Sequence, residues 1–275
     1  MLFGPPSAGL RACAAAAEAG LDLTGTFFSF GGEPYTRAKA SAIERAGCRA
    51  ESSYYISELG GPVAVSCPRA TEVDEGHLVL DRIAGIVKPR ILSCGTPVRP
   101  LFFTTLSTRT PQVAINLESG DEAVERDASC GCAFAEAGLS RTVHAIRSYE
   151  KLSTEGMHFV GPDLVTLLDE VLPGRFGGGP TDYQLVEEED EQGRSRLDLA
   201  VSPRLGALDE ARVAEAALDF LRSRGPAESM MAEIWRSGGT LRVVRREPEV
   251  SRAAKVLPLH VSRAASPRRT SGASS

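Results

Sequence analysis

The sequence contains no apolar run long enough to cross a membrane, and it has no basic stripe outside the arginines of its last residues. A spanning helix needs about 20 consecutive apolar residues, and a nucleic-acid-binding surface needs clustered positive charge. The formal net charge of -5 points the same way. These absences exclude a membrane-spanning protein and argue against one that binds nucleic acid or a membrane surface.

The first twenty residues lack the basic leader of a signal peptide, and Arg11 and Glu18 interrupt their apolar stretch. We therefore expect a cytoplasmic protein. In that compartment the six cysteines are expected to be free thiols or metal ligands rather than disulfides. Stability must then come from an apolar core, for which 275 residues with 42% hydrophobic content suffice.

The strongest local pattern lies early in the chain. An apolar run at residues 27–30 ends in the glycines of G-G-E-P at residues 31–34, and a helix is predicted from Thr36 to its end at Gly47. Residues 48–55 then read as a second strand. Two adjacent parallel strands would present their following loops at one carboxyl edge, where open α/β sheets bind ligands. Glycines that admit a flat ligand, an aromatic ring and a carboxylate suit a nucleotide there.

The G-G-E-P of residues 31–34 and the Y-Y-I-S-E of residues 54–58 resemble paired motifs of the adenylate-forming superfamily, in the branch of the phenylacetate-coenzyme A ligases. The second motif of that branch is Y-G-x-T-E, so Tyr55 stands where the family has glycine. Five further landmarks follow in the family's order, at Phe103–Leu106, Ser119–Asp121, Cys130–Cys132, Ile146–Gly156 and Lys255. The resemblance covers about residues 1–260.

The resemblance implies an α/β protein, with part of the adenylate-forming large domain (a mixed sheet with helices) followed by a small α+β C-terminal domain. We expect the partial AMP-binding domain at residues 1–148, the small lid domain at residues 149–261 and a disordered tail at residues 262–275. The apolar pattern also predicts strands at residues 112–117 and 231–235, and it places Lys255 after the last strand.

The resemblance also implies a nucleotide site. Tyr54 would stack on adenine, Ser57 would bond the α-phosphate, Glu58 would hold Mg²⁺, and Asp121 would accept ribose hydroxyls. The turn residues expected beside the nucleotide are Gly31, Gly32, Glu33 and Pro34. A turn followed by a solvated acid, and an exposed loop aspartate, explain the same residues from spacing alone, and these alternatives stay open.

Two later positions take roles from the same resemblance. Arg147 occupies the segment that serves the family as a hinge, and it would reach the ribose. Lys255 would swing in to orient the substrate carboxylate and stabilise negative charge, work that suits a point charge. The expected catalytic groups are therefore Lys255 and Glu58. The alternatives are a surface charge cluster around Arg147 and an exposed lysine near the tail.

Cys130 and Cys132 are the clearest metal signal, because two thiolates this close in sequence can bind one tetrahedral zinc. Cys67 and His77 would complete a Cys3His site. With all four ligands supplied by protein, such a zinc would be structural and not catalytic. A pair of free loop thiols is the alternative.

These 275 residues contain no Ser/Thr/Gly-rich loop ending in Pro-Lys, which in the family wraps the phosphates of ATP. We expect a truncated ATP-dependent carboxylic acid-coenzyme A ligase, which converts an acid to an acyl-adenylate and then to acyl-CoA, with the chain alone inactive. The alternative is a non-catalytic, zinc-stabilised AMP-binding or interaction protein. Expected ligands are ATP or AMP, Mg²⁺, coenzyme A and a small carboxylic acid; a homodimer is compatible with the sequence.

Overall fold

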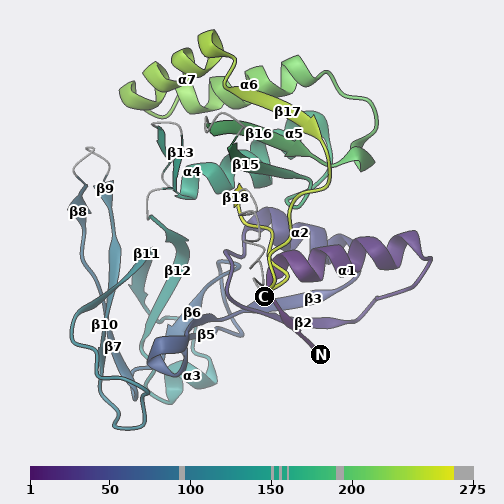
Figure 1. The fold of residues 1–275 in the computed structure, drawn as a ribbon. Coiled ribbons are helices and arrows are strands. Elements are labelled where there is room, and N and C mark those ends of the chain that lie inside the picture. Colours follow the sequence, from purple (N-terminus) through teal and green to yellow (C-terminus); the bar gives the residue numbers. More distant parts are fainter. Residues whose placement is uncertain (93–96, 150–151, 155–156, 160, 190–194, 263–275) are drawn as a thin grey trace, which may run out of the picture.

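The computed structural model describes residues 1–92, 97–149, 152–154, 157–159, 161–189 and 195–262. Figure 1 shows two groups of elements: an N-terminal lobe (residues 1–149) built on two sheets, and a C-terminal lobe (residues 161–262) above it. The hairpin of β13 (Leu152–Thr154) and β14 (Met157–Phe159) comes between them in the chain. The prediction that a large mixed-sheet domain precedes a small α+β domain is confirmed at the level of fold class.

A three-stranded parallel sheet opens the N-terminal lobe. Its strands, in the order β1-β2-β3, are β1 (Leu2–Gly4), β2 (Phe27–Phe30) and β3 (Arg49–Ser52). The connecting helices are α1 (Pro6–Glu18) and α2 (Arg37–Arg45), and Thr36 caps α2 by accepting the Lys39 amide. Phe28, Phe30 and the fully buried Ile43 fill the space between sheet and helices. The predicted strand, turn and helix are confirmed.

The predicted strand at residues 48–55 divides into two. β3 ends at Ser52, the Ser53 amide still donates to Phe30 in β2, and Tyr54 then opens a strand of a different sheet. The chain leaves the parallel sheet there because residues 54–56 pair with β5 of the antiparallel sheet instead. The G-G-E-P turn after β2 and the chain after β3 nevertheless line one cavity, although the second predicted loop, residues 54–58, is strand β4 and the start of η1.

A seven-stranded antiparallel sheet forms the rest of the N-terminal lobe. Its order is β4-β5-β6-β12-β11-β10-β7. The strands are β4 (Tyr54–Ile56), β5 (Gly61–Ser66), β6 (Gly76–Leu78), β7 (Ile83–Val87), β10 (Pro100–Thr105), β11 (Leu117–Asp127) and β12 (Arg141–Ser148). The short elements along it are η1 (Ser57–Leu59), β8 (Arg90–Ile91), β9 (Pro97–Val98) and α3 (Ala133–Glu136). Leu78, Leu101 and Phe103 are buried in its core.

The strand predicted at residues 112–117 is wrong. That segment is irregular, and its apolar residues Val113 and Ile115 are 86% and 75% exposed. The strand begins only at Leu117 and is β11, in which one residue, Ala123, is buried. Because β11 is polar on both faces, apolar alternation could not reveal it. Asp121 therefore lies within a strand, not after one.

The C-terminal lobe packs a continuous helical segment and two further helices on a four-stranded sheet of order β17-β16-β15-β18. The helical segment comprises α4 (Gly161–Thr166), the π-helical turn η2 (Leu167–Val171) and α5 (Leu172–Phe176). The other elements are β15 (Tyr183–Glu189), β16 (Ser195–Val201), η3 (Pro203–Leu205), α6 (Glu210–Arg222), α7 (Pro226–Gly238), β17 (Leu241–Arg245) and β18 (Leu259–Ser262). Trp235 and Tyr183 are the largest buried side chains of its core.

Two sequence-based predictions for this lobe are wrong. Residues 231–235 belong to helix α7, where Pro226 at the first turn favours a helix and the buried Ala232 and Trp235 are spaced for one helical face. The last strand is β18, so Lys255 precedes it. β18 ends at Ser262, the first residue of the predicted tail, and residues 263–275 lie outside the described residues.

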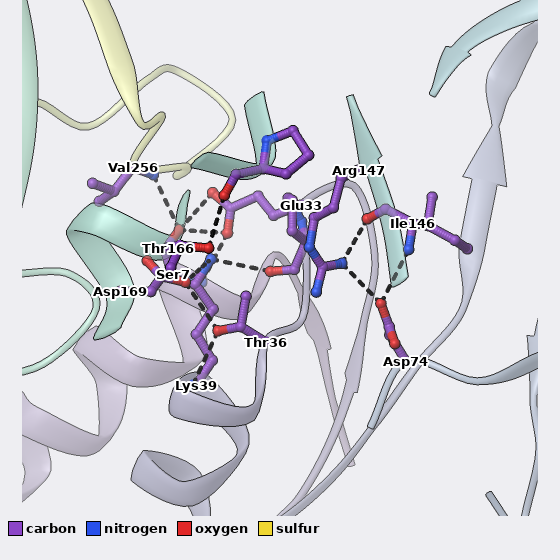
Figure 2. A network of polar contacts seen from close by, with 12 residues as sticks. Ser7, Glu33, Thr36, Lys39, Asp74, Ile146, Arg147, Thr166, Asp169 and Val256 are labelled. Atoms are coloured by element: carbon purple, nitrogen blue, oxygen red, sulfur yellow. Dashed lines mark hydrogen bonds and ion pairs between the residues drawn. The ribbon is translucent and has the colours of Figure 1, made fainter. Parts of the chain in front are cut away.

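A buried ion pair joins the two lobes. Lys39 in α2 approaches Asp169 in η2 at 3.4 Å, and both side chains are more than nine-tenths buried. Thr36 donates to the same Asp169 oxygen at 2.9 Å, and Lys39 also donates to the Pro34 carbonyl at 3.0 Å (Figure 2). Burial raises the pKa of Asp169, against the lowering effect of Lys39 and Thr36. π-Turns in helices often mark functional positions, and here the turn carries the interlobe carboxylate.

Among the described helices, none has the length and apolar character needed to cross a membrane.

Breaking the interlobe pair from one side should be costly, because the remaining charge stays buried without its partner. We expect Asp169→Asn to lower the free energy of unfolding by about 3–5 kcal/mol, and Asp169→Leu with Lys39→Met to recover most of that loss. Denaturant titration measures both. The control is Arg37→Ala, on the same helix as Lys39. It removes a solvent-exposed ion pair with Glu72 and should change stability by under about 1 kcal/mol. Equal stability of Asp169→Asn and the parent protein would contradict this.

Candidate nucleotide site

A cavity of about 330 Å³ lies where the carboxyl edge of the parallel sheet meets the long antiparallel sheet. Its walls come from six stretches of chain that are remote in sequence. The lining residues are Gly32, Glu33, Pro34, Tyr35, Ser52, Ser53, Tyr54, Tyr55, Asp74, Asp121, Ile146, Ser148 and Lys255. The cavity therefore brings together six of the residues that the sequence assigned to nucleotide binding or catalysis.

The two glycines of the G-G-E-P turn give space to side chains of the protein itself. A Cβ atom on Gly31 would lie 2.8 Å from the Tyr55 ring, and one on Gly32 would lie 3.0 Å from Lys255 Nζ. Gly32 also has a φ of +78°, which strains any other residue. The glycines thus admit an aromatic ring and an ammonium group to the backbone.

Ser7 links this turn to the segment that carries Lys255. Its amide and hydroxyl both donate to the Glu33 carboxylate, at 2.9 Å and 2.7 Å, and its hydroxyl oxygen accepts the Val256 amide at 3.1 Å (Figure 2). Glu33 therefore does not present a free carboxylate to the cavity. We name residues 249–257, between β17 and β18, the lysine loop; Figure 1 shows it, in yellow, descending from the C-terminal lobe toward α1.

Gln184 in β15 holds the other side of the lysine loop. It is fully buried, its amide nitrogen donates to the carbonyls of Glu249 and Leu257, and its oxygen accepts the Glu249 amide at 2.6 Å. Within the loop, Ser251 Oγ accepts the Lys255 amide at 3.1 Å. Sequence reasoning missed Ser7 and Gln184, because neither lies in a motif and only the folded chain brings them to the loop.

Tyr54 and Asp121, which both line the cavity, form a hydrogen bond with each other. The Tyr54 hydroxyl donates to Asp121 Oδ2 at 2.5 Å, and the ring packs at 6.2 Å from that of Phe103. Burial, followed by the charge of Asp121, raises the pKa of Tyr54 well above its usual value. Tyr54 thus stays a neutral donor and orients the Asp121 carboxylate. Tyr35 and Tyr55 also line the cavity, and sequence reasoning assigned neither ring; Tyr55 is 47% exposed.

Arg147 does not line this cavity. Its guanidinium pairs with Asp74 at 2.8 Å and faces an adjoining cavity of about 240 Å³. Asp74 also accepts the amides of Ala145 and Ile146, at 3.2 Å and 3.3 Å, where β12 bulges away from β11 (Figure 2). Ala145 has a φ of +53°, a conformation that costs about 1–3 kcal/mol and needs such support. Asp74, which no sequence motif marks, therefore shapes the wall at Ile146.

Ser57 and Glu58 lie in η1 with exposed side chains, and neither lines the cavity. Lys255 does line it, and none of the described carboxylates lies within ion-pair distance of its ammonium group. By contrast, the carboxylates of Glu33, Asp74 and Asp121 each bond a protein donor. The electrostatics of the cavity therefore favour an anionic ligand at the Lys255 end and hydroxyl groups at the Asp121 end.

The predicted metal ligands also come together, at one end of the seven-stranded sheet and outside the cavity. The donor atoms of Cys67, His77, Cys130 and Cys132 all lie within 4.8 Å of one another.

Comparison with protein-family models and with curated proteins gives no match. Among solved structures, the anthranilate CoA ligase AuaEII in complex with anthranoyl-AMP aligns with 93% of this chain, at a TM-score of 0.51 and 12% identity. This chain has the adenylate-forming ligase fold. The amide bond synthetase McbA from Marinactinospora thermotolerans and the ATP-bound chimera RpMatB-BxBclM each give a TM-score of 0.50 over 93% of the chain, at 15% and 11% identity.

The chain spans about half the length of these three structures: 48%, 50% and 49%. At such low identity the similarity concerns the fold alone.

Removing the Ser7 hydroxyl should loosen the lysine loop. In Ser7→Ala the Val256 amide loses its acceptor, and a hydrogen bond in a charged network contributes about 1.5 kcal/mol. We therefore expect hydrogen exchange of the Val256 amide to become about tenfold faster, measured by mass spectrometry or NMR. Ser223→Ala, which removes a hydroxyl at the exposed end of α6, is the control and should leave this amide unchanged. Unaltered exchange at Val256 in folded Ser7→Ala would show that Ser7 does not hold the loop.

Proposed function

We propose that the cavity binds the adenosine monophosphate part of an acyl-adenylate, and that the chain belongs to an ATP-dependent ligase that joins a small carboxylic acid to coenzyme A. The observation that carries the proposal is the meeting of Gly32, Tyr54, Asp121 and Lys255 in one cavity. The solved structures with the same fold include complexes with anthranoyl-AMP and with ATP. The early motifs favour the phenylacetate-coenzyme A ligase-like branch.

The roles of the residues follow from the charges in the cavity. Asp121 accepts the Tyr54 hydroxyl through Oδ2, and a carboxylate in this position can also accept two ribose hydroxyls. Lys255 can bond a phosphate oxygen and stabilise the charge that develops when a carboxylate attacks the α-phosphate. The exposed Tyr55 ring offers apolar surface to the base. A cavity of about 330 Å³ lies at the lower end of the range for small-ligand sites.

In the proposed reaction, a carboxylate oxygen attacks the α-phosphate of ATP and pyrophosphate leaves, which gives an acyl-adenylate. The coenzyme A thiol then attacks the acyl carbon, and AMP leaves with the thioester formed. Mg²⁺ would neutralise the phosphates in the first step. Because Glu58 does not line the cavity, the proposal rests on Asp121 and Lys255 and gives Glu58 no defined contact with the nucleotide.

The position of Glu58 favours a second candidate, in which the chain binds AMP without catalysing its transfer. The cavity would then act as a nucleotide-binding site in a protein that retains the fold. The two candidates agree on AMP binding and differ on turnover. ATP-pyrophosphate exchange discriminates between them, since only a ligase reverses acyl-adenylate formation.

Binding of AMP should depend on the carboxylate at position 121. We expect Asp121→Asn to weaken AMP affinity at least tenfold, about 1.4 kcal/mol, because an amide accepts fewer hydroxyl hydrogen bonds than a carboxylate. Isothermal titration calorimetry measures the affinity. The matched control is Asp127→Asn, at the exposed end of the same strand, and it should bind AMP like the parent protein. Equal AMP affinity in Asp121→Asn and the parent would remove this residue from the site.

A separate assay addresses turnover. The 275 residues contain no phosphate-wrapping loop, so alone they should give no exchange of labelled pyrophosphate into ATP. For the ligase, exchange across a panel of aryl and aliphatic acids should become measurable once a segment with that loop is supplied, and Lys255→Ala should then reduce it by at least 100-fold with a smaller effect on AMP affinity. AMP binding with no exchange above background for any acid, even with that segment supplied, would instead support the non-catalytic candidate.

A further inference from the structure

Four potential metal ligands converge at one end of the long sheet. Cys67 follows β5, His77 lies in β6, and Cys130 and Cys132 lie between β11 and α3. Their donor atoms all lie within 4.8 Å of one another, although more than fifty residues of chain separate the first pair from the second. Three of the four residues are buried. Folding therefore gathers three sulfur atoms and one imidazole into a single enclosed cluster.

The distances in the cluster fit one tetrahedral ion. His77 Nε2 lies 3.5 Å from Cys130 Sγ and 3.2 Å from Cys132 Sγ, and the two sulfur atoms are 3.4 Å apart. With Zn–S bonds of about 2.3 Å and Zn–N bonds of about 2.1 Å, ligand atoms of a tetrahedral site lie about 3.6–3.8 Å apart. Small outward movements of these side chains would therefore create the site. Three thiolates and one imidazole are a donor set that zinc prefers.

The surroundings of His77 orient it as a ligand. Its Nδ1 lies 2.7 Å from the Leu139 carbonyl oxygen, which can only accept, so Nδ1 carries the proton. The lone pair of Nε2 is then directed at the sulfur atoms. Ligand histidines of zinc sites generally donate their second ring nitrogen in this way, which fixes the ring and raises its basicity. A fully buried imidazole thus has both nitrogens committed, one to a carbonyl and one to the cluster.

The backbone between the two later cysteines is also held in place. Gly131 has a φ of +56°, so the chain turns sharply there and both thiols point to the same side. Arg69, from the segment that begins at Cys67, donates to the carbonyls of Cys130 and Gly131, at 3.3 Å and 2.8 Å. These contacts tie the two halves of the cluster together independently of any ion.

Two residues of the cluster flank a segment, residues 68–76, that contributes Asp74 to the cavity. Cys67 and His77 bracket residues 68–76, and Asp74 within this segment holds Arg147 and the bulge of β12. The Cys67 amide donates to the Glu75 carbonyl at 3.0 Å, so the two ends of the segment already lie together. A metal ion that joins Cys67 and His77 to the loop after β11 would fix Asp74 relative to β11, the strand that carries Asp121.

We propose that Cys67, His77, Cys130 and Cys132 bind one structural zinc ion, which fastens the segment at residues 68–76 to the loop between β11 and α3. All four coordination positions are filled by protein, so the ion has no open position for catalysis. The proposal does not depend on nucleotide binding. It concerns the stability of the sheet end and the placement of Asp74, whatever ligand the cavity takes.

The test is zinc content and its thermal consequence, measured without nucleotide. Protein expressed with added zinc should contain about one zinc per chain by mass spectrometric elemental analysis. Cys130→Ser with Cys132→Ser should retain less than a tenth of that amount. Cys13→Ala with Cys48→Ala, which removes two buried thiols beside α2, is the control and should retain all of it. A strong chelator should lower the unfolding temperature of the parent protein by several degrees, since zinc binding to the folded state adds to its stability.

If the double serine variant does not fold, measurements on the parent protein alone test whether the cluster binds a metal ion. Cobalt exchanged into it should give the intense thiolate-to-cobalt absorption and the visible bands of a tetrahedral site. The proposal is overturned if folded parent protein holds no zinc above background, if the serine variant keeps the full amount, or if cobalt gives no thiolate absorption. A Cys130–Cys132 disulfide found by mass mapping of non-reduced protein would overturn it as well. Zinc content and cobalt spectra are measured without nucleotide, and the AMP titration compares Asp121→Asn with the parent protein, so the two proposals can fail separately.

Discussion

Ser7 carries the contact on which the arrangement of the cavity depends. One hydroxyl group donates to Glu33 in the G-G-E-P turn and accepts the amide of Val256 in the lysine loop. It thereby joins the N-terminus of α1, the turn after β2 and a loop of the C-terminal lobe, which lie 249 residues apart at the extremes. Lys255 reaches the cavity because its neighbour is held in this way, and Gly32 leaves room for its ammonium group.

The interlobe contacts divide into a buried part and a part at the cavity. Lys39 and Asp169 are enclosed, and their pairing costs desolvation, so it specifies one docking arrangement more than it adds stability. The contact of Ser7 with Val256 is a single hydrogen bond at the edge of the same interface. An arrangement held by one buried pair and a few edge contacts can change without unfolding either lobe, since each lobe has its own core.

Local patterns predicted the fold where one segment decides its own structure. The cap at Thr36 and the glycines after β2 behave as their residue types require. The prediction failed at β11 because a strand that is half-exposed on both faces has no alternation of apolar and polar residues. It failed at α7 because the apolar residues of Met231–Trp235 fit the spacing of a helix as well as that of a strand.

Cys67, His77, Cys130 and Cys132 were predictable as a group from residue chemistry, whereas Ser7, Asp74 and Gln184 act through contacts that only the tertiary structure creates.

The central claim is that the cavity between Asp121 and Lys255 receives the adenylate. A crystal structure of the chain with a non-hydrolysable acyl-sulfamoyl adenosine tests it most directly. We expect the ribose hydroxyls at Asp121, the base beside Tyr55 and the sulfamoyl group facing Lys255 Nζ. A compound bound elsewhere, or bound in the cavity with its ribose away from Asp121 and its sulfamoyl group away from Lys255, would contradict the account.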